Sequence, residues 1–121
     1  MDESTRQALT NDRTIDITTT GRQSGKPHRI EIVFSNLDGH IYITGTPGRR
    51  DWYANLVAHP AFTFHLKQSA TADLPARATP ITDAATRGRV FPPILERFNR
   101  TNDLDAWVAG SPLVEVAFEE A

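Results

Sequence analysis

The stretch "TTTGRQSGKPHRIEI", residues 18–32, joins two alternating segments through a turn bracketed by glycines. Before the turn, residues 14–20 are rich in β-branched side chains that alternate with polar ones, which predicts a strand. Gly21 and Gly25 can adopt positive φ angles, as tight turns require. After the turn, residues 28–34 alternate between an apolar and a mostly polar face. The stretch therefore predicts a β-hairpin.

The same reasoning extends outward to the rest of the chain. The Asp-Gly pair in "NLDGH" is typical of a tight hairpin turn, so three consecutive antiparallel strands are expected first. We expect about six strands, over residues 14–20, 28–34, 41–45, 61–67, 72–81 and 113–118. We expect two or three packed helices, drawn from residues 2–11, 50–59, 84–99 and one helical turn in 103–110. Strands this short in a chain of 121 residues favour a small closed or split β-barrel with helices outside it.

Prolines qualify two of these elements. Pro75 and Pro80 lie in the expected strand 72–81 and suggest an edge strand or a bulge. Asp83 is suited to cap the helix that begins at residue 84. Pro92-Pro93 removes two backbone donors inside that helix, which predicts a kink or two short helices rather than one straight rod.

Composition limits the class of protein. The length suits a single domain over residues 1–121 with one modest core. The absence of cysteine excludes disulfides and thiolate metal sites, and it suits a reducing cytoplasm. No apolar run approaches the roughly 20 residues that a membrane helix needs. The acidic, polar N-terminus does not resemble a secretory signal.

The net charge of −2 conceals a local excess of positive charge. Residues 22–50 contain five basic and two acidic residues, whereas the segments before and after are acidic. An isolated positive region on an acidic chain suggests a small anionic ligand. A nucleic-acid partner would call for a broader basic face, so none is expected.

The first basic cluster surrounds the hairpin turn. Arg22, Lys26 and Arg29 flank the glycines, and Ser24 adds a hydroxyl group. Arginine can hold a phosphate or carboxylate with two parallel hydrogen bonds, and glycines allow backbone amides to approach an anion closely. The alternative is a solvated hairpin tip. Basic hairpin tips are common, and on these residues alone the alternative is favoured.

The second basic cluster lies in "GTPGRRDWYANL". Arg49 and Arg50 precede a predicted helix, whose free amides and dipole already favour anions. Cations there are mildly unfavourable unless something negative joins them, and Asp51 can offset them in part. The two clusters together predict a basic corner that could bind an anion.

The residues that follow the second cluster have two interpretations each. Trp52 and Tyr53 could stack on a planar ligand or form the buried face of the helix, and core packing is favoured for Trp52. Asn55 on a short helix is expected at the surface or as a local cap. No metal site is expected, because the four histidines lack ligand spacing and no cysteine supports them.

Taken together, "TTTGRQSGKPHR" and "GRRDWYANLVAHP" resemble the deazaflavin-dependent nitroreductase and quinone reductase family, within the flavin/deazaflavin oxidoreductase superfamily. The resemblance is good over residues 14–67 and looser beyond them. It implies a split β-barrel of the flavin-reductase or pyridoxamine-oxidase type. It also implies coenzyme F420 as cofactor, or FMN in some branches, and hydride transfer to a small electron-poor acceptor such as a quinone, nitro compound or enone. A flavin- or deazaflavin-binding protein without catalysis is the further alternative, and the protein could be a monomer or a homodimer.

The resemblance also implies roles for individual residues. The cofactor's phosphate and acidic tail would be held from the hairpin, and its ring would lie along the backbone of the loop after the third strand. His28 and Arg29 lie on opposite faces of their strand, so only one of them can face the cofactor. Tyr53 or a threonine near Thr44 is the candidate proton donor. The implied cofactor-binding residues are Arg22, Gln23, Ser24, Lys26, His28 or Arg29, Thr44, Gly45, Thr46, Gly48, Arg49, Arg50, Trp52, Tyr53 and Asn55.

Overall fold

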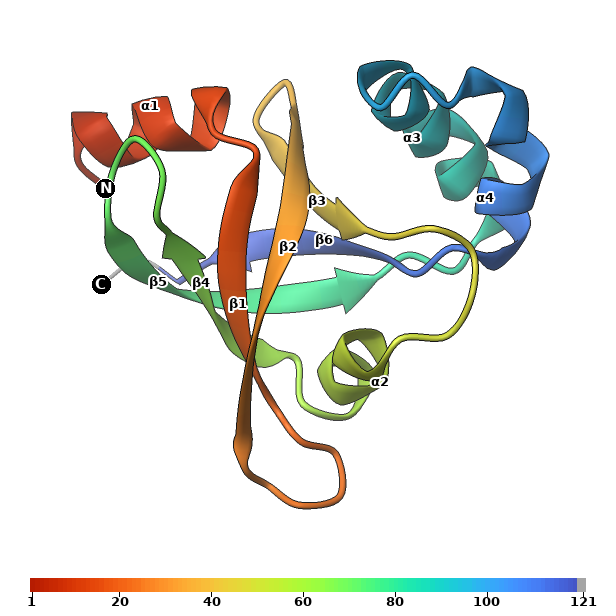
Figure 1. The fold of residues 1–121 in the computed structure, drawn as a ribbon. Helices are drawn as coiled ribbons and strands as arrows, with labels where there is room; N and C mark the ends of the chain where they lie inside the picture. The colour runs from red at the N-terminus through yellow and green to blue at the C-terminus, as the bar shows by residue number, and fades with distance from the viewer. Residues whose placement is uncertain (120–121) are drawn as a thin grey trace.

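The computed structural model describes residues 1–119, which form an antiparallel six-stranded barrel with helices around it (Figure 1). The barrel closes in the order β1-β2-β3-β6-β5-β4. The strands are β1 (Thr14–Thr20), β2 (Pro27–Leu37), β3 (His40–Thr44), β4 (Ala61–Leu66), β5 (Ala72–Pro80) and β6 (Leu113–Phe118). The helices are α1 (Glu3–Asn11), α2 (Asp51–Ala58), α3 (Ala84–Arg97) and α4 (Leu104–Gly110), with a 3₁₀ turn η1 (Thr101–Asp103).

The two predicted hairpins are confirmed. Strands β1 and β2 pair from Thr14 opposite Val33 to Thr20 opposite Pro27, and the tip of this hairpin projects below the barrel in Figure 1. The β2–β3 turn consists of Asp38 and Gly39, both with positive φ, which matches the tight turn expected of an Asp-Gly pair.

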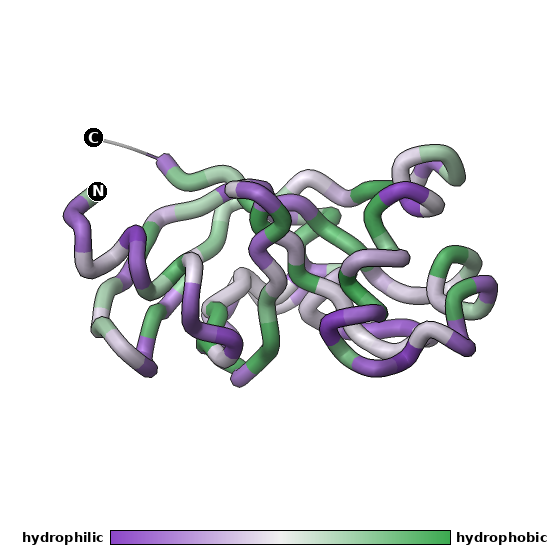
Figure 2. The backbone as a smooth tube through the Cα atoms, turned by 90° about the horizontal axis from the view of Figure 1, so that it is seen from above, coloured by the Kyte–Doolittle hydropathy of each residue, from purple (hydrophilic) through white to green (hydrophobic). Residues whose placement is uncertain are grey.

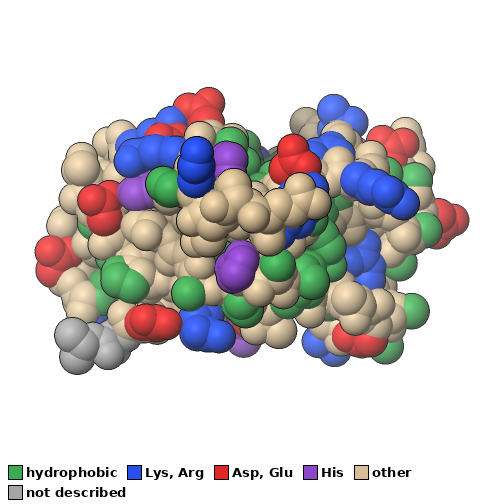
Figure 3. Space-filling view, turned by 90° about the horizontal axis from the view of Figure 1, so that it is seen from below, with side chains coloured by type: hydrophobic (Ala, Val, Ile, Leu, Met, Phe, Trp, Pro, Cys, Tyr) green, Lys and Arg blue, Asp and Glu red, His purple; other side chains and the backbone are tan. Residues whose placement is uncertain are grey.

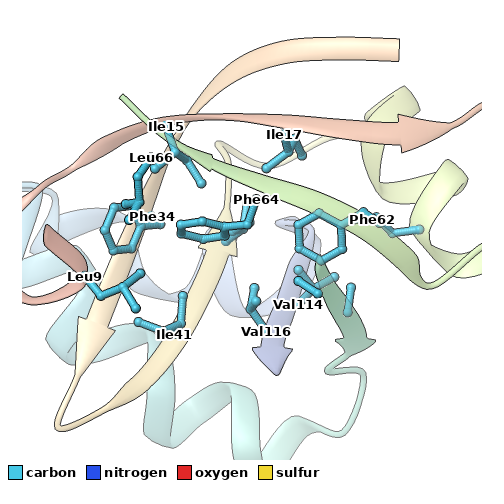
Figure 4. Close-up of a cluster of buried hydrophobic side chains, with 14 of the residues drawn as sticks. Leu9, Ile15, Ile17, Phe34, Ile41, Phe62, Phe64, Leu66, Val114 and Val116 are labelled. Atoms are coloured by element: carbon cyan, nitrogen blue, oxygen red, sulfur yellow. The ribbon is translucent and has the colours of Figure 1, made fainter. Parts of the chain in front are cut away.

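The barrel interior is apolar. Alternate strand residues point inward, so hydrophobic stretches recur along the strands while polar stretches mark the loops (Figure 2). Phe34 and Phe64 are fully buried and pack edge to face with ring centroids 5.3 Å apart (Figure 4). Ala8 and Leu9 of α1 join the same cluster and close one end of the barrel.

A second apolar cluster lies outside the barrel. Tyr42 of β3 and Leu113 of β6 pack with α3 and α4, which lie together beside the barrel in Figure 1. Phe91 and Trp107 pair edge to face across these two helices at 6.1 Å between centroids. Helix α2 lies apart from this pair (Figure 1). In residues 1–119 no helix is long and apolar enough to cross a membrane.

The predicted edge or bulge at residues 72–81 is wrong. Strand β5 pairs with β4 on one side and β6 on the other, in continuous register. Proline has no backbone N–H to donate to a neighbouring strand. At both prolines, the side on which this N–H would lie is where the neighbouring strand ends. On the β6 side, the amide of Glu119, just past the end of β6, donates to the Pro75 carbonyl. On the β4 side, the amide of Ala78 donates to the carbonyl of Pro60, just before β4 begins, and Pro80 faces the same side beyond that point. Two prolines therefore fit an interior strand.

Of the two alternatives predicted around Pro92-Pro93, a kink or two short helices, the second is wrong, since α3 is one helix from Ala84 to Arg97. The carbonyls that lose their partners belong to Gly88 and Arg89, which are exposed, so water can satisfy them. The expected Asp83 cap is confirmed by its bond from the Thr86 amide at 2.8 Å. The count of two or three helices was low, because α1 and α4 are both full helices.

Candidate functional site

Two cavities lie on either side of the first turn of α2. The large groove, of about 1170 Å³, lies between this turn and the α3–α4 pair. The small pocket, of about 390 Å³, lies between α2 and the tip of the β1–β2 hairpin. The large groove is lined by Arg22, Gly48, Arg49, Arg50, Asp51, Tyr53, Ala54, Thr82, Ala84, Arg87, Val108, Ala109, Gly110, Ser111 and Pro112. The small pocket is lined by Thr19, Gly21, Arg22, Gln23, Ser24, His28, Ile30, Asp51, Trp52 and Asn55.

The two glycines of the hairpin tip lie in a tight turn. A Cβ at Gly21 would lie 2.5 Å from Ser24 Oγ and 2.7 Å from His28 Nε2, so a larger residue there would require these two side chains to move. Gly25 has φ +70° and its amide donates to the Gly21 carbonyl. The positive φ therefore favours glycine at position 25 whether or not a ligand is bound, whereas Gly21 does not adopt the positive φ that the sequence suggested.

Arg22 connects the hairpin tip to α2. Its backbone amide and its Nη1 both donate to Asn55 Oδ1, at 3.1 and 3.0 Å, and its Nη2 donates to Asp51 Oδ1 at 3.2 Å. Asn55 in turn donates to Thr19 Oγ1 and is only 4% exposed. The expectation of a surface or capping Asn55 is wrong, because three polar groups of β1 and the hairpin tip hold it inside.

The second basic cluster lies at the N-terminus of α2, as predicted. Arg50 occupies the N-cap position and its guanidinium donates to the Thr46 carbonyl at 3.0 Å and to Thr46 Oγ1 at 2.6 Å. It therefore covers the loop after β3, including Gly45, which lines neither cavity. Arg49 lines the large groove, and among residues 1–119 its side chain forms no hydrogen bond or ion pair.

The aromatic residues of α2 divide between core and groove. Trp52 is 8% exposed and belongs to the barrel core, which confirms the favoured interpretation, although its edge also lines the small pocket. Tyr53 is half-buried and lines the large groove. Thr44 is buried and its hydroxyl donates to the Pro112 carbonyl. Of these two candidate proton donors, Tyr53 alone faces the groove.

The structure separates His28 from Arg29. His28 lines the small pocket, whereas the Nε of Arg29 lies 3.0 Å from Asp16 Oδ2 on the opposite face of the hairpin. Lys26 lines neither cavity. The residues that meet at the cavities are thus Arg22, Gln23, Ser24 and His28 from the hairpin, and Gly48 to Asn55 from the loop and α2.

Sequence reasoning missed Arg87, which forms the far wall of the large groove. Its side chain is 8% exposed and donates to four backbone carbonyls, those of Ile81, Trp107, Val108 and Ser111, at 2.5–3.2 Å. Its guanidinium also lies 5.1 Å from the centre of the Phe91 ring. Burial lowers the pKa of the Arg87 guanidinium, which nevertheless stays charged at neutral pH.

A signal for Arg87 exists in the sequence. It stands four residues before Phe91, on the apolar stripe that continues through Ile94 and Leu95. A charged residue on a buried stripe predicts a buried interaction. Residues 108–112 of the same wall were also missed, because they form no motif. Arg87 binds the carbonyls of Val108 and Ser111, while Gly48 and Thr44 bind those of Gly110 and Pro112.

The charge of the large groove is positive. Four arginines and one carboxylate, that of Asp51, line it. On the face seen from below, basic side chains are interspersed with acidic ones and do not form one continuous basic surface (Figure 3). Among residues 1–119 no group of histidine and acidic side chains is placed to hold a metal ion. The geometry suits an organic anion with a planar part between the small side chains of α2, α3 and α4.

Residues 3–109 match the family described as F420H(2)-dependent quinone reductase. The chain belongs to this family. The match spans the hairpin, α2, α3 and α4 as far as residue 109, so it includes every residue of the small pocket and all of the large groove except Gly110, Ser111 and Pro112. Comparison with curated proteins yields no match.

Solved structures confirm the split-barrel fold of this F420H(2)-dependent quinone reductase family member. A conserved hypothetical protein from Mycobacterium tuberculosis superposes with a TM-score of 0.76 at 20% identity, covering 99% of this chain and 82% of that one. A structure described as an F420-H2 dependent reductase gives 0.65 at 17% identity, covering 89% and 95%. A candidate pyridoxamine 5'-phosphate oxidase from Listeria innocua gives 0.70 at 12% identity, covering 96% and 91%. At these identities the likeness concerns the fold alone.

Proposed function

We propose that the protein is a reductase that uses reduced coenzyme F420 to deliver hydride to a small electron-poor acceptor, such as a quinone, nitro compound or enone. The observation that carries this proposal is the meeting of the two basic clusters. Arg22 from the hairpin and Arg49 and Arg50 from α2 face one groove in a chain of the F420H(2)-dependent quinone reductase family.

The residues present fit such a cofactor. Its phosphodiester and carboxylates need positive charge and donors, which Arg22, Gln23, Ser24 and His28 offer at the hairpin. Its planar ring needs a flat space, which the small residues of the large groove offer. These are Gly48, Ala54, Ala84, Ala109 and Gly110. For the ring to lie along the loop after β3, Arg50 would have to leave Thr46.

When bound, F420 in its reduced form supplies hydride, and the chain's own residues would orient the two reactants. The walls formed by Tyr53 and by the segment 108–112 would exclude water from the groove. The phenol of Tyr53, a half-buried residue that lines the groove, would supply the proton that a reduced acceptor needs. Arg87 would act on the reaction only by holding the far wall in place.

The remaining features complete this proposal. We expect residues 1–121 to act as one domain, as a monomer or a homodimer. A chain without cysteine suits the cytoplasm, where we expect the protein to act.

A titration of the purified protein with F420 and, separately, with FMN tests the cofactor. Trp52 at the small pocket serves as the fluorescent reporter, and we expect quenching with micromolar F420 and weaker binding of FMN. Oxidation of reduced F420 is then followed with a quinone, a nitroaromatic and an enone. Preference for FMN would select the FMN-dependent alternative, and binding without turnover of any acceptor would select the non-catalytic one. Absence of binding to either cofactor would contradict the proposal.

A further inference from the structure

We propose that Asp51 is a specificity-determining residue. Its carboxylate, a negative charge of the protein itself, pairs with Arg22 and lowers the affinity for ligands with a doubly charged phosphate. This inference rests on the proposed function, because it concerns the same groove and its anionic ligand. It adds a preference for a phosphodiester, with one negative charge, over a terminal phosphomonoester, with two.

The position of Asp51 is the first observation. Its Oδ1 lies 3.2 Å from Arg22 Nη2, and it lines both the large groove and the small pocket. Among residues 1–119 no other aspartate or glutamate lines either cavity. An anion that approaches Arg22 from either side therefore meets the Asp51 carboxylate first.

The second observation is that the contact can be displaced. The Asp51 side chain is 91% exposed, and that of Arg22 is 39% exposed. Exposed pairs of this kind contribute little to stability, so a ligand phosphate can replace Asp51 on Nη2. The other Arg22 bonds, to the buried Asn55, keep the guanidinium aimed at the cavities after Asp51 has moved away.

Displacement does not remove the negative charge. Asp51 is the first residue of α2, and its backbone keeps the carboxylate within a screening length, about 8–10 Å in physiological salt, of any anion held by Arg22. As the acidic residue of the first turn of α2, Asp51 also reduces the attraction of the helix's positive N-terminal end for a ligand anion. The resulting repulsion scales with ligand charge, so it is about twice as large for a dianion as for a monoanion at the same point.

The test compares the wild type with Asp51→Asn, using FMN, riboflavin and inorganic pyrophosphate as probes. FMN and riboflavin differ only in the phosphomonoester, which is close to a dianion at pH 7.5. Asp38→Asn, in the β2–β3 turn, is the matched control, because it removes the same charge far from both cavities and asparagine tolerates the positive φ of residue 38. Dissociation constants are measured by calorimetry at low and at 0.5 M salt.

We expect Asp51→Asn to bind FMN about tenfold more tightly at low salt, pyrophosphate, which carries about three negative charges, by a larger factor, and F420 only about threefold more tightly. The gain should shrink at 0.5 M salt, riboflavin affinity should not change, and Asp38→Asn should match the wild type. The inference is overturned by equal affinities of wild type and Asp51→Asn for FMN and pyrophosphate, by an equal gain for riboflavin, or by the same gain in Asp38→Asn. The proposed function is judged separately by F420 binding to the wild type. Pyrophosphate still tests Asp51 if F420 does not bind.

Discussion

Two of the four arginines that line the large groove, Arg87 and Arg22, serve it in opposite ways. Arg87 is buried, and its guanidinium is fully engaged by four carbonyls of the α3–α4 side and by the Phe91 ring. Arg22 is partly exposed and is engaged by two side chains, one of which, Asp51, is almost free in solvent. Charge alone therefore does not identify a ligand residue.

The difference lies in what each guanidinium would lose to a ligand. A ligand that bound Arg87 would have to break bonds to buried carbonyls, each costly to leave unpaired, at about 1–3 kcal/mol apiece. A ligand that bound Arg22 would replace one exposed carboxylate with another anion. We infer that Arg87 maintains the groove and that Arg22 is available to what enters it.

Replacing Arg87 should have the largest effect. We expect Arg87→Ala to lower the free energy of unfolding by about 3–5 kcal/mol, because it strands buried carbonyls and removes the contact with Phe91. Urea denaturation at neutral pH measures the change. Arg89→Ala, on the exposed face of the same helix, is the control and should cost less than about 0.5 kcal/mol. A loss below 1 kcal/mol for Arg87→Ala would show that the carbonyls find water instead.

The contrast also explains what the sequence could predict. The β2–β3 turn was predictable because Asp38 and Gly39 determine it locally, and α2 was predictable because Pro60 ends an amphipathic run. The same holds for the hairpin tip, because the groups that favour its glycines lie within a few residues of them in the sequence. Properties decided within a short stretch of chain were predicted well.

Properties decided by distant partners were not. Asn55 is buried only because Thr19 and Arg22 lie beside it in space. The prolines of β5 fit an interior strand only because β4 and β6 end where the missing amides point. Arginine is a residue type usually exposed on a helix, so Arg87 alone does not reveal its partners. The carbonyls that it binds lie 6 to 24 positions away in the sequence. The near wall of the site could therefore be predicted, and the far wall could not.

The second effect concerns binding rather than stability. Arg22→Ala should lower the affinity for an anionic cofactor about tenfold or more, since a charge-assisted hydrogen bond contributes roughly 1.5–3 kcal/mol. It should lower the free energy of unfolding by about 1–2 kcal/mol. The exposed ion pair with Asp51 contributes little of this, and most comes from the lost Nη1 bond to Asn55, whose Oδ1 keeps its bond from the Arg22 backbone amide. Calorimetric titration with F420, paired with urea denaturation, measures both. Arg6→Ala on α1, which also removes an arginine from an exposed pair, is the control and should leave binding unchanged. If Arg22→Ala bound F420 as tightly as the wild type, Arg22 would not be a ligand-binding residue, and its contrast with Arg87 would be wrong.

The smallest effect concerns the outer face of the β1–β2 hairpin, where Arg29 binds Asp16 instead of lining a cavity. Hydrogen bonds from Lys67 and then Arg29 lower the pKa of Asp16 below its ordinary 3.8. Because the folded-state pKa is the lower one, this carboxylate stabilises the fold at pH above about 4 and ceases to do so as the pH falls through its folded-state pKa. Asp16→Asn should therefore be less stable than the wild type at pH 7, and the difference should fade as the solution is made more acidic. Thermal unfolding between pH 7 and pH 2 measures this, with Asp38→Asn as the control for charge loss alone. A stability difference that stays constant with pH would mean that Asp16 acts through packing, and Arg29 would then be free to turn toward a ligand.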